Sequence, residues 1–180
     1  MSTQVNTPGY LAGTWVIDAV HSDVSFQVRY FGVAKLCGSF DDFEGTIVTA
    51  ENPLDSSVNA VIRTASVNTK NTARDDNLRQ ADFLDVDQYP TMTFASTGVR
   101  VDGDRFLVDG DLTIRAVTKQ VTLNLEFNGV GAGFTGKPLV GFSAYGEISR
   151  NEFGVAGGPM AAAVSDKVRI AIEIAAHKQD

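Results

Sequence analysis

The stretch VTLNLEF, residues 121–127, alternates apolar and polar side chains without a break. Its apolar residues fall on one side of an extended chain and its polar residues fall on the other. Residues 22–30 and the run KVRIAIEIAAH, residues 167–177, repeat this two-residue period. The pattern is typical of β-strands that bury one face and leave the other in water.

Further strand candidates follow the same rule along most of the chain, with short connections between them. The total is about nine segments, and the additional ones are residues 14–19, 39–49, 57–64, 91–101, 105–115 and 139–149. The step Asp102-Gly103-Asp104 predicts a type I′ hairpin turn, because glycine and aspartate tolerate the positive φ that this turn requires. Strands do not alternate with helices, so we expect consecutive strands to pair antiparallel in a barrel or a sandwich.

Length and composition indicate one globular domain. The chain has 180 residues, of which 43% are hydrophobic and 21% are charged, and these values suit a single β domain with a sizeable core. We expect this domain to span residues 14–177. The opening stretch, residues 1–13, is expected to be a flexible N-terminal segment.

The charge balance and the N-terminal sequence narrow the choice of partner and compartment. A net charge of −7 would repel a phosphate backbone, so nucleic acid is not an expected partner. The N-terminus has no basic region followed by an apolar one, and no apolar run of about 18 residues occurs, so we expect a cytoplasmic protein. Cys37 is the only cysteine; it can form no internal disulfide and is expected to be a small buried side chain.

The densest cluster of charge is TARDDNLRQADFLD, residues 72–85. Its first four residues fit a capping box, in which the Thr72 hydroxyl caps the first helical turn and the carboxylate of Asp75 reaches back. Acidic residues early in the segment and Arg79 later in it suit the helix dipole. A short helical segment near residues 72–85 is therefore favoured over a catalytic carboxylate or a metal site.

No other motif assembles the groups that catalysis needs. His21 and His177 are the only histidines, share no metal-ligand spacing with Cys37, and are expected to be solvated or hydrogen-bonded. The chain has neither a nucleophile-elbow motif nor a phosphate-binding glycine pattern. We therefore expect no enzyme activity, no catalytic residue, no metal site and no cofactor.

The remaining indication of function comes from the apolar residues. The chain carries 11 phenylalanines, many of them on strand faces that are predicted to point inward. The pattern alone favours an ordinary filled core over a ligand cavity, although barrels of lipocalin size can hold one small ligand.

An ordered set of short motifs resembles the YceI-like polyisoprenoid-binding family. The resemblance runs from about Trp15 to Ile174, and its specificity lies in the order of the motifs rather than in any one of them. In chain order they are IDAVHSDVSF (17–26), GSF (38–40), FEG (43–45), SVNT (66–69), RD (74–75) with Leu78, DFLD (82–85), YP (89–90), GDLTI (110–114) and SRNEFG (149–154).

This resemblance implies an all-β protein, an extended lipocalin-like antiparallel β-barrel with a short helical element beside it. The protein would bind and carry or sequester a long-chain isoprenoid lipid, of the polyprenyl or isoprenoid quinone type, and no catalysis is established for the family. Transient membrane contact and a homodimer are compatible with this role. The ligand-binding residues would be the inward-facing apolar ones: Phe26, Val28, Tyr30, Phe40, Phe94, Leu123, Leu125, Phe127, Phe142, Ile170 and Ile172.

Two other functions stay open at this point. One is an interaction or stress-response protein with a filled barrel and no lipid ligand. The other is an enzyme that uses Asp75, Asp76 or Asp82 of the charged segment.

The Gly/Ala-rich stretch VAGGPMAAAV, residues 155–164, interrupts the strand pattern. Its glycines permit movement, and Met160, Ala161 and Val164 are apolar enough to cover an opening. We expect this stretch to lie over or near the mouth of the tube.

Overall fold

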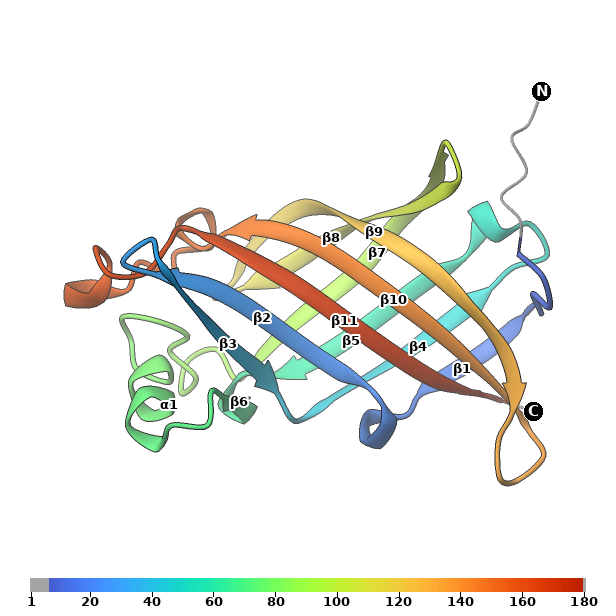
Figure 1. Cartoon of the computed structure of the whole chain (residues 1–180), viewed down its shortest axis with the longest axis horizontal. Coiled ribbons are helices and arrows are strands. Elements are labelled where there is room, and N and C mark those ends of the chain that lie inside the picture. The colour runs from blue at the N-terminus through green and yellow to red at the C-terminus, as the bar shows by residue number, and fades with distance from the viewer. Residues whose placement is uncertain (1–6, 180) are drawn as a thin grey trace.

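The computed structural model describes residues 7–179, and its strands form one antiparallel sheet that closes into an elongated barrel (Figure 1). Around the barrel the strand order is β1-β4-β5-β7-β8-β9-β10-β11, and β11 pairs in turn with β1. The predicted all-β antiparallel barrel is confirmed. The strands of the barrel are β1 Gly13–Ile17, β4 Phe43–Thr49, β5 Ser57–Arg63, β7 Thr91–Asp102, β8 Arg105–Ile114, β9 Val117–Ala132, β10 Pro138–Ser149 and β11 Lys167–Lys178.

Closure of the barrel depends on β11, which pairs with two strands in succession. Ala176 to Lys178 pair with β1, and Arg169 to Glu173 pair with β2, Asp23–Tyr30. β1 and β2 thus behave as one strand broken by a 3-10 turn, Ala19–His21. Beyond β2, the sheet continues through β3, Ala34–Phe40, to the short β6, Val67–Asn68.

The described part of the predicted flexible segment contacts the barrel. Tyr10 packs edge-on against the ring of Phe127, with ring centroids 5.9 Å apart, and its hydroxyl donates to the carbonyl of Ala50. Residues 1–6 of that segment lie outside the described residues. The single domain at residues 14–177 and the flexibility of the segment before it stay predictions.

The hairpin turns differ from the one expected. Gly103 has φ 64°, but Asp104 does not share a positive φ, so the β7–β8 turn lacks the two left-handed residues of a type I′ turn. Two such residues occur instead at the β8–β9 turn, where Arg115 and Ala116 have φ 52° and 60°. The Arg115 guanidinium donates to two carbonyls within residues 81–83, each at 2.6 Å, so a tertiary contact favours a conformation that the local sequence does not.

The helix α1, Thr72–Leu78, is shorter than predicted and is capped by a different residue. Asn71 is the N-cap, and its side-chain oxygen accepts from the amide of Arg74 at 2.9 Å. The predicted Thr72 cap is therefore wrong by one position, because the chain enters the helix one residue earlier. Asp75 does reach back, but it accepts from the amide and hydroxyl of Thr69 at 2.8 and 2.6 Å.

Residues 79–90 form hydrogen-bonded turns rather than more helix, and with α1 they lie between β3 and β7 at one end of the barrel (Figure 1). Arg79 fixes this segment by donating to the carbonyls of Ala65 and Val67 at 3.0 and 3.3 Å. Phe83 is buried against the barrel. The side of the barrel that β3 leaves uncovered is thus closed by the charged segment.

Two strand assignments and one burial assignment need correction. The predicted strand 39–49 is two strands, β3 and β4, because Asp41 and Asp42 form the turn between them, and β3 begins as early as Ala34. The two-residue β6 was not predicted. Cys37 is exposed on β3 rather than buried. Its neighbour Leu36 pairs with Val28, which lines the cavity, so the alternation directs the Cys37 side chain to the outer face even though the residue borders the cavity.

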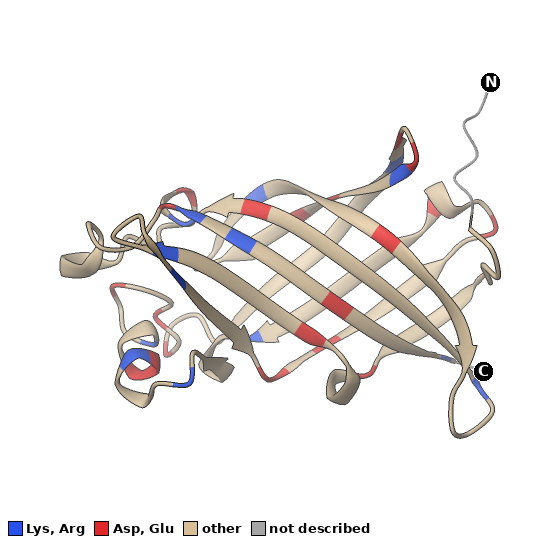
Figure 2. Ribbon diagram, in the orientation of Figure 1, with Lys and Arg blue, Asp and Glu red and all other residues tan. Residues whose placement is uncertain are grey.

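Buried residues form two clusters, one toward each end of the barrel. The cluster near α1 contains Phe40, Val67, Phe83, Met92, Leu112, Ile114, Phe153 and Val155. The other is built around Trp15, whose indole N–H donates to Thr49 Oγ1 at 2.8 Å, and also holds Ile17, Phe43, Ile47, Val140, Phe142 and Ala176. Charged residues are spread along the barrel and its ends (Figure 2). Among residues 7–179, no helix is long and apolar enough to cross a membrane.

Replacing Asn71 with alanine should lower the free energy of unfolding by about 1 kcal/mol, because the Arg74 amide loses its cap. Thr72→Ala is the matched control and should change stability by a few tenths of that value, since Thr72 is the first helical residue and not the cap. Urea unfolding of both variants measures the difference. A larger loss at Thr72 than at Asn71 would contradict this cap assignment.

Candidate functional site

A long apolar cavity of about 840 Å³ runs through the barrel. Strand alternation builds its wall: along β11, Val168, Ile170, Ile172 and Ile174 all face the cavity, while the residues between them do not. The same rule holds on β8, where Phe106, Val108, Leu112 and Ile114 line the cavity. The expectation of a filled core, drawn from the pattern alone, is therefore wrong.

All eleven residues predicted to line a lumen do lie on the cavity wall. They come from β2, β3, β7, β9, β10 and β11, so segments far apart in sequence converge on one space. Tyr30 differs from the others because it is exposed and stands at the rim. Contact between these residues and a ligand stays a prediction.

Sequence reasoning missed wall residues that come from outside the regular strands. Tyr10 lines one end of the cavity from the N-terminal segment, and Leu78 and Phe83 line the other from α1 and the turns after it. Leu78 and Phe83 stand out in the sequence as apolar residues in a charged segment. Tyr10 has no comparable signal, because its segment shows no strand or helix period.

The cavity stays open because three wall side chains lie flat over glycines. An added Cβ on Gly38 would collide with the ring of Phe26, which is its direct cross-strand partner. An added Cβ on Gly110 would likewise collide with the ring of Phe94, although its cross-strand partner on β7 is Ser96, and one on Gly146 would collide with the Leu123 side chain. A larger residue at any of the three glycines would force the covering side chain toward the lumen. The glycines therefore set the width of the cavity.

Polar groups on the wall gather at its ends. Near α1 the cavity is bordered by Thr69, Arg74 and Asn77, and Arg74 donates to the Thr69 hydroxyl and carbonyl at 2.7 and 2.8 Å. The opposite end carries Tyr10 and Ser56. Among the described wall residues the only charged ones are Arg74 and Arg150. Such a site suits a long apolar chain with a polar group at one end.

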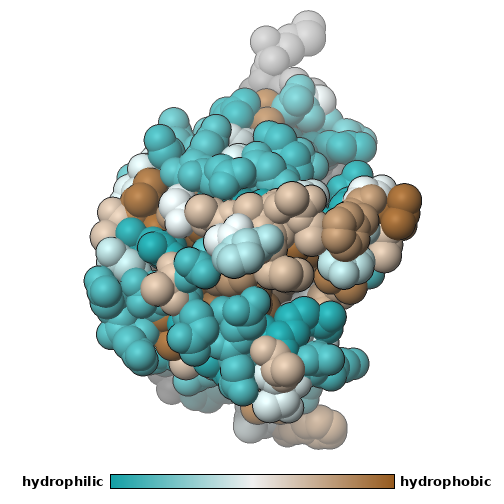
Figure 3. Space-filling view, turned by 90° about the vertical axis from the view of Figure 1, so that its left-hand side faces the viewer, coloured by the Kyte–Doolittle hydropathy of each residue, from teal (hydrophilic) through white to brown (hydrophobic). Residues whose placement is uncertain are grey.

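The Gly/Ala-rich stretch lies at the α1 end, and its Met160 and Val164 face the cavity. Arg150 holds it in place: the buried guanidinium donates to the carbonyls of Val155, Ala156, Ala161, Val164 and Ser165 at 2.8–3.1 Å. Five carbonyl partners offset the cost of burying this charge. Figure 3 views this end, where apolar residues occupy the centre of the face. Movement of the stretch as a lid stays a prediction.

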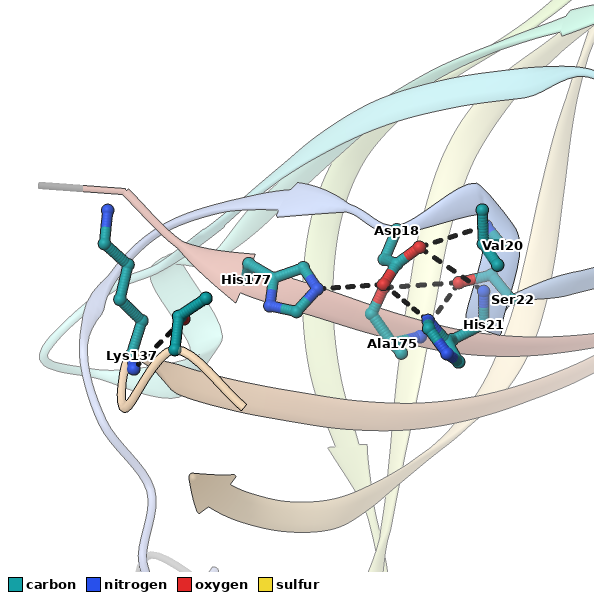
Figure 4. Close-up of polar contacts among 8 residues, drawn as sticks. Asp18, Val20, His21, Ser22, Lys137, Ala175 and His177 are labelled. Carbon is teal, nitrogen blue, oxygen red and sulfur yellow. Dashed lines mark hydrogen bonds and ion pairs between the residues drawn. The ribbon is translucent and has the colours of Figure 1, made fainter. Parts of the chain in front are cut away.

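Both histidines belong to one polar cluster, which lies outside the cavity at the break between β1 and β2 (Figure 4). Asp18 Oδ2 lies 2.7 Å from His21 Nδ1 and 2.8 Å from His177 Nε2. These contacts lower the pKa of Asp18 to about 2, with His177 the largest cause and His21 the next. The cluster ties the turn to β11, and Ser22 reinforces it by hydrogen bonds to the Ala175 backbone.

This arrangement confirms the prediction that His21 and His177 are hydrogen-bonded. Among residues 7–179, no group of three His, Cys, Asp or Glu residues is placed to hold a metal ion. The carboxylates of the charged segment are engaged in structure as well: Asp75 binds Thr69, and Asp76 lies 3.0 Å from Arg79. Neither of these two carboxylates faces the cavity.

The family model of the YceI-like domain matches residues 15–176. The chain belongs to the YceI-like family. "Protein YceI" of Escherichia coli O6:H1 is 43% identical over 136 residues, which cover 75% of this chain and 71% of that one.

Two solved structures share the fold of this YceI-like chain. BcnA of Burkholderia cenocepacia superposes with a TM-score of 0.79 at 24% identity, covering 88% of this chain and 98% of BcnA. A polyisoprenoid binding domain from Saccharophagus degradans superposes with a TM-score of 0.68 at 19% identity, covering 94% of this chain and all of that domain. The resemblance to the family that the motifs indicated is thereby confirmed.

Gly38→Ala should reduce the capacity of the cavity, because the new methyl group displaces the Phe26 ring toward the lumen and meets Thr69 Cγ2 at 2.9 Å. The free energy of unfolding should fall by about 1–3 kcal/mol. Gly131→Ala on β9 is the control, since an added Cβ there meets nothing within 4 Å. Urea midpoints measure the effect, and adding Phe26→Leu to Gly38→Ala should recover part of the loss. Equal stability of the two alanine variants would contradict the tight packing over Gly38.

The Asp18 cluster should make stability depend on pH at the acid end. The pKa of Asp18 is lowered in the folded state from a usual 3.8 to about 2, so its contribution is complete above pH 3.8 and disappears as pH falls through 2. Because the histidine rings are partly exposed, we expect on the order of 1 kcal/mol. Asp18→Asn should be less stable than wild type at pH 5 by this amount, and the gap should narrow toward pH 2. Asp104→Asn, at an exposed turn, is the control; a gap that does not change with pH would refute the assignment.

Proposed function

We propose that this protein binds a long-chain isoprenoid lipid, of the polyprenyl or isoprenoid quinone type, in the lumen of its barrel and carries or sequesters it. The observation that carries this proposal is the continuous apolar cavity. The Saccharophagus degradans domain, described as polyisoprenoid-binding, has the same fold and supports the choice of ligand class.

The dimensions of the cavity favour a chain over a compact ligand. Wall residues on β11 run from Val168 to Ile174, and at about 3.3 Å per residue this stretch alone is roughly 20 Å long. Each CH₂ group that leaves water for such a tube gains roughly 0.8 kcal/mol. Affinity should therefore grow with tail length and depend little on the polar group.

The side chains that face the lumen support a binding protein rather than an enzyme. In the described part of the chain no acid, histidine or lysine lines the cavity, and the two arginines there are hydrogen-bonded to protein groups. A polar head group would find its partners at the α1 end, near Arg74 and Asn77. The filled-barrel alternative would need a packed interior, which the cavity does not provide. The cytoplasmic compartment and the homodimer stay predictions.

Tryptophan at two adjacent positions of β9 tests the lumen directly. Leu125 faces the cavity and Asn124 is exposed on the outer face. Leu125→Trp should lose little stability, because the empty lumen has room for the indole, but it should bind added geranylgeraniol at least tenfold more weakly. Asn124→Trp should bind as wild type does. The measurements are urea midpoints of the lipid-free proteins and titrations with geranylgeraniol, with a straight-chain alcohol of equal carbon number as the comparison ligand.

Undiminished binding by Leu125→Trp, together with a stability loss of about 1–3 kcal/mol, would show that position 125 is a packed core site and would defeat the lumen proposal. Equal affinity for the straight-chain alcohol would keep the lumen but remove the isoprenoid preference.

A further inference from the structure

The α1 end of the barrel carries exposed apolar side chains that form one surface around the mouth of the cavity. Phe31 and Val33, at the β2–β3 turn, are 63% and 82% exposed, and Met160 is 40% exposed. The turn and the Gly/Ala-rich stretch are joined by a hydrogen bond from the Phe31 amide to the Ala163 carbonyl at 2.8 Å. We call Tyr30, Phe31, Val33 and Met160 the mouth rim.

Two rim residues also line the cavity, so the rim and the lumen are continuous. Tyr30 and Met160 are exposed to solvent and belong to the cavity wall. Figure 3 shows apolar residues running from the middle of this face to its right-hand edge, with hydrophilic residues above and below them. Contiguous exposed apolar surface with a polar border marks an interaction site, whereas single exposed residues such as Phe134 do not.

The fold does not require an aromatic residue at the tip of the β2–β3 turn. Phe31 has φ 49°, a left-handed conformation in which glycine or asparagine is favoured and phenylalanine is uncommon. Its ring touches Tyr30, with centroids 4.6 Å apart, but it is otherwise directed to solvent. A residue that costs conformational energy and buries little contributes to something other than folding.

Basic side chains lie directly behind the rim on the outer face of β11, β2 and β3. Arg29 and Lys35 are opposite one another in the β2–β3 pairing, and Arg169 lies opposite Gln27 in the β11–β2 pairing. Lys167 begins β11. Like charges that face each other across strands are destabilising, so this arrangement calls for an anionic partner in a chain whose net charge is −7.

The acidic groups of this end neutralise that cluster only in part. Glu147 forms an ion pair with Arg169 at 4.0 Å, both side chains being largely exposed, whereas Asp166 accepts from Ser149 and Asn151. Asp76, Asp85 and Asp87 belong to α1 and the turns that follow it, which lie apart from the β2–β3 turn (Figure 1). Asp82, in the same turns, lies against the Gly/Ala-rich stretch, where its carbonyl accepts from the Gly157 amide at 2.8 Å. The basic residues therefore gather on the side of this end that carries the β2–β3 turn.

We propose that this end of the barrel docks on an anionic lipid bilayer. Phe31, Val33 and Met160 insert at the boundary between head groups and acyl chains, and Arg29, Lys35, Lys167 and Arg169 contact the head groups. An apolar tip with cations behind it fits a bilayer better than a protein surface, which would have to supply a matching hollow. The reason for docking rests on the proposed function, since a lipid tail could then pass between membrane and lumen without crossing water.

Vesicle flotation tests the docking. Lipid-free protein is mixed with vesicles of phosphatidylcholine and phosphatidylglycerol, or of phosphatidylcholine alone. We expect binding to the anionic vesicles, weakened by added salt, and little binding to the neutral ones. Phe31→Asn, which suits the left-handed backbone, should weaken binding about tenfold. Arg29→Gln and Lys35→Gln should each weaken it about fivefold.

The controls use matched residues at other places on the barrel. Phe134→Asn replaces a fully exposed aromatic residue in the β9–β10 turn, and Arg105→Gln replaces an exposed cation at the β7–β8 turn. Both variants should bind vesicles as wild type does. Leu125→Trp should lose geranylgeraniol uptake and keep vesicle binding, so a failure of docking and a failure of lipid binding are told apart.

Absence of binding to anionic vesicles would overturn the docking proposal, and so would equal binding by wild type and Phe31→Asn. Sedimentation of the protein alone adds a further check: a dimer that Phe31→Asn dissociates would make the rim a contact between two copies of the chain and would also overturn the proposal.

Discussion

The double pairing of β11 is the constraint on which the rest of the structure depends. On one side β11 pairs with β10 from Lys167 to His177, and on the other it pairs first with β2 and then with β1. Without the short β1 contact the sheet would have two free edges, and water would reach the lumen along the seam. The Asp18 cluster lies at the point where the partner of β11 changes, and it keeps the turn between β1 and β2 fixed to β11. Closure of the sheet and exclusion of water thus depend on the same few residues.

A closed sheet of alternating residues does not by itself decide between a packed interior and an empty one. In this barrel the sizes of a few wall residues leave the interior empty. Phe26, Phe94 and Leu123 lie flat over glycines, so large apolar groups cover the wall without filling the lumen. Packed clusters toward the two ends, one around Trp15 and the other around Phe153, supply the tight packing that the middle gives up. The ends of the barrel therefore supply stability, and the middle supplies the space for a ligand.

Much of the wall could be predicted from the sequence, because the two-residue period fixes which side chains point inward. That period placed Leu123, Leu125 and Ile170 on the lumen side, where they lie. It could not show that the lumen is hollow, since the contact of Gly38 with Phe26 depends on strand register. It also could not place the helix cap, because Asn71 and Thr72 are both good caps and the choice depends on where the chain leaves β6. The left-handed Arg115 was beyond prediction for a similar reason: contacts with the turns after α1 hold it.

We propose above all that the lumen is a lipid site. Its most direct test is organic extraction of the purified protein followed by mass spectrometry, with the extracted lipid quantified against protein. We expect a polyprenyl or isoprenoid quinone lipid at close to one molecule per chain. Extracts without such a lipid, from protein that also fails to take up added isoprenoid, would contradict it.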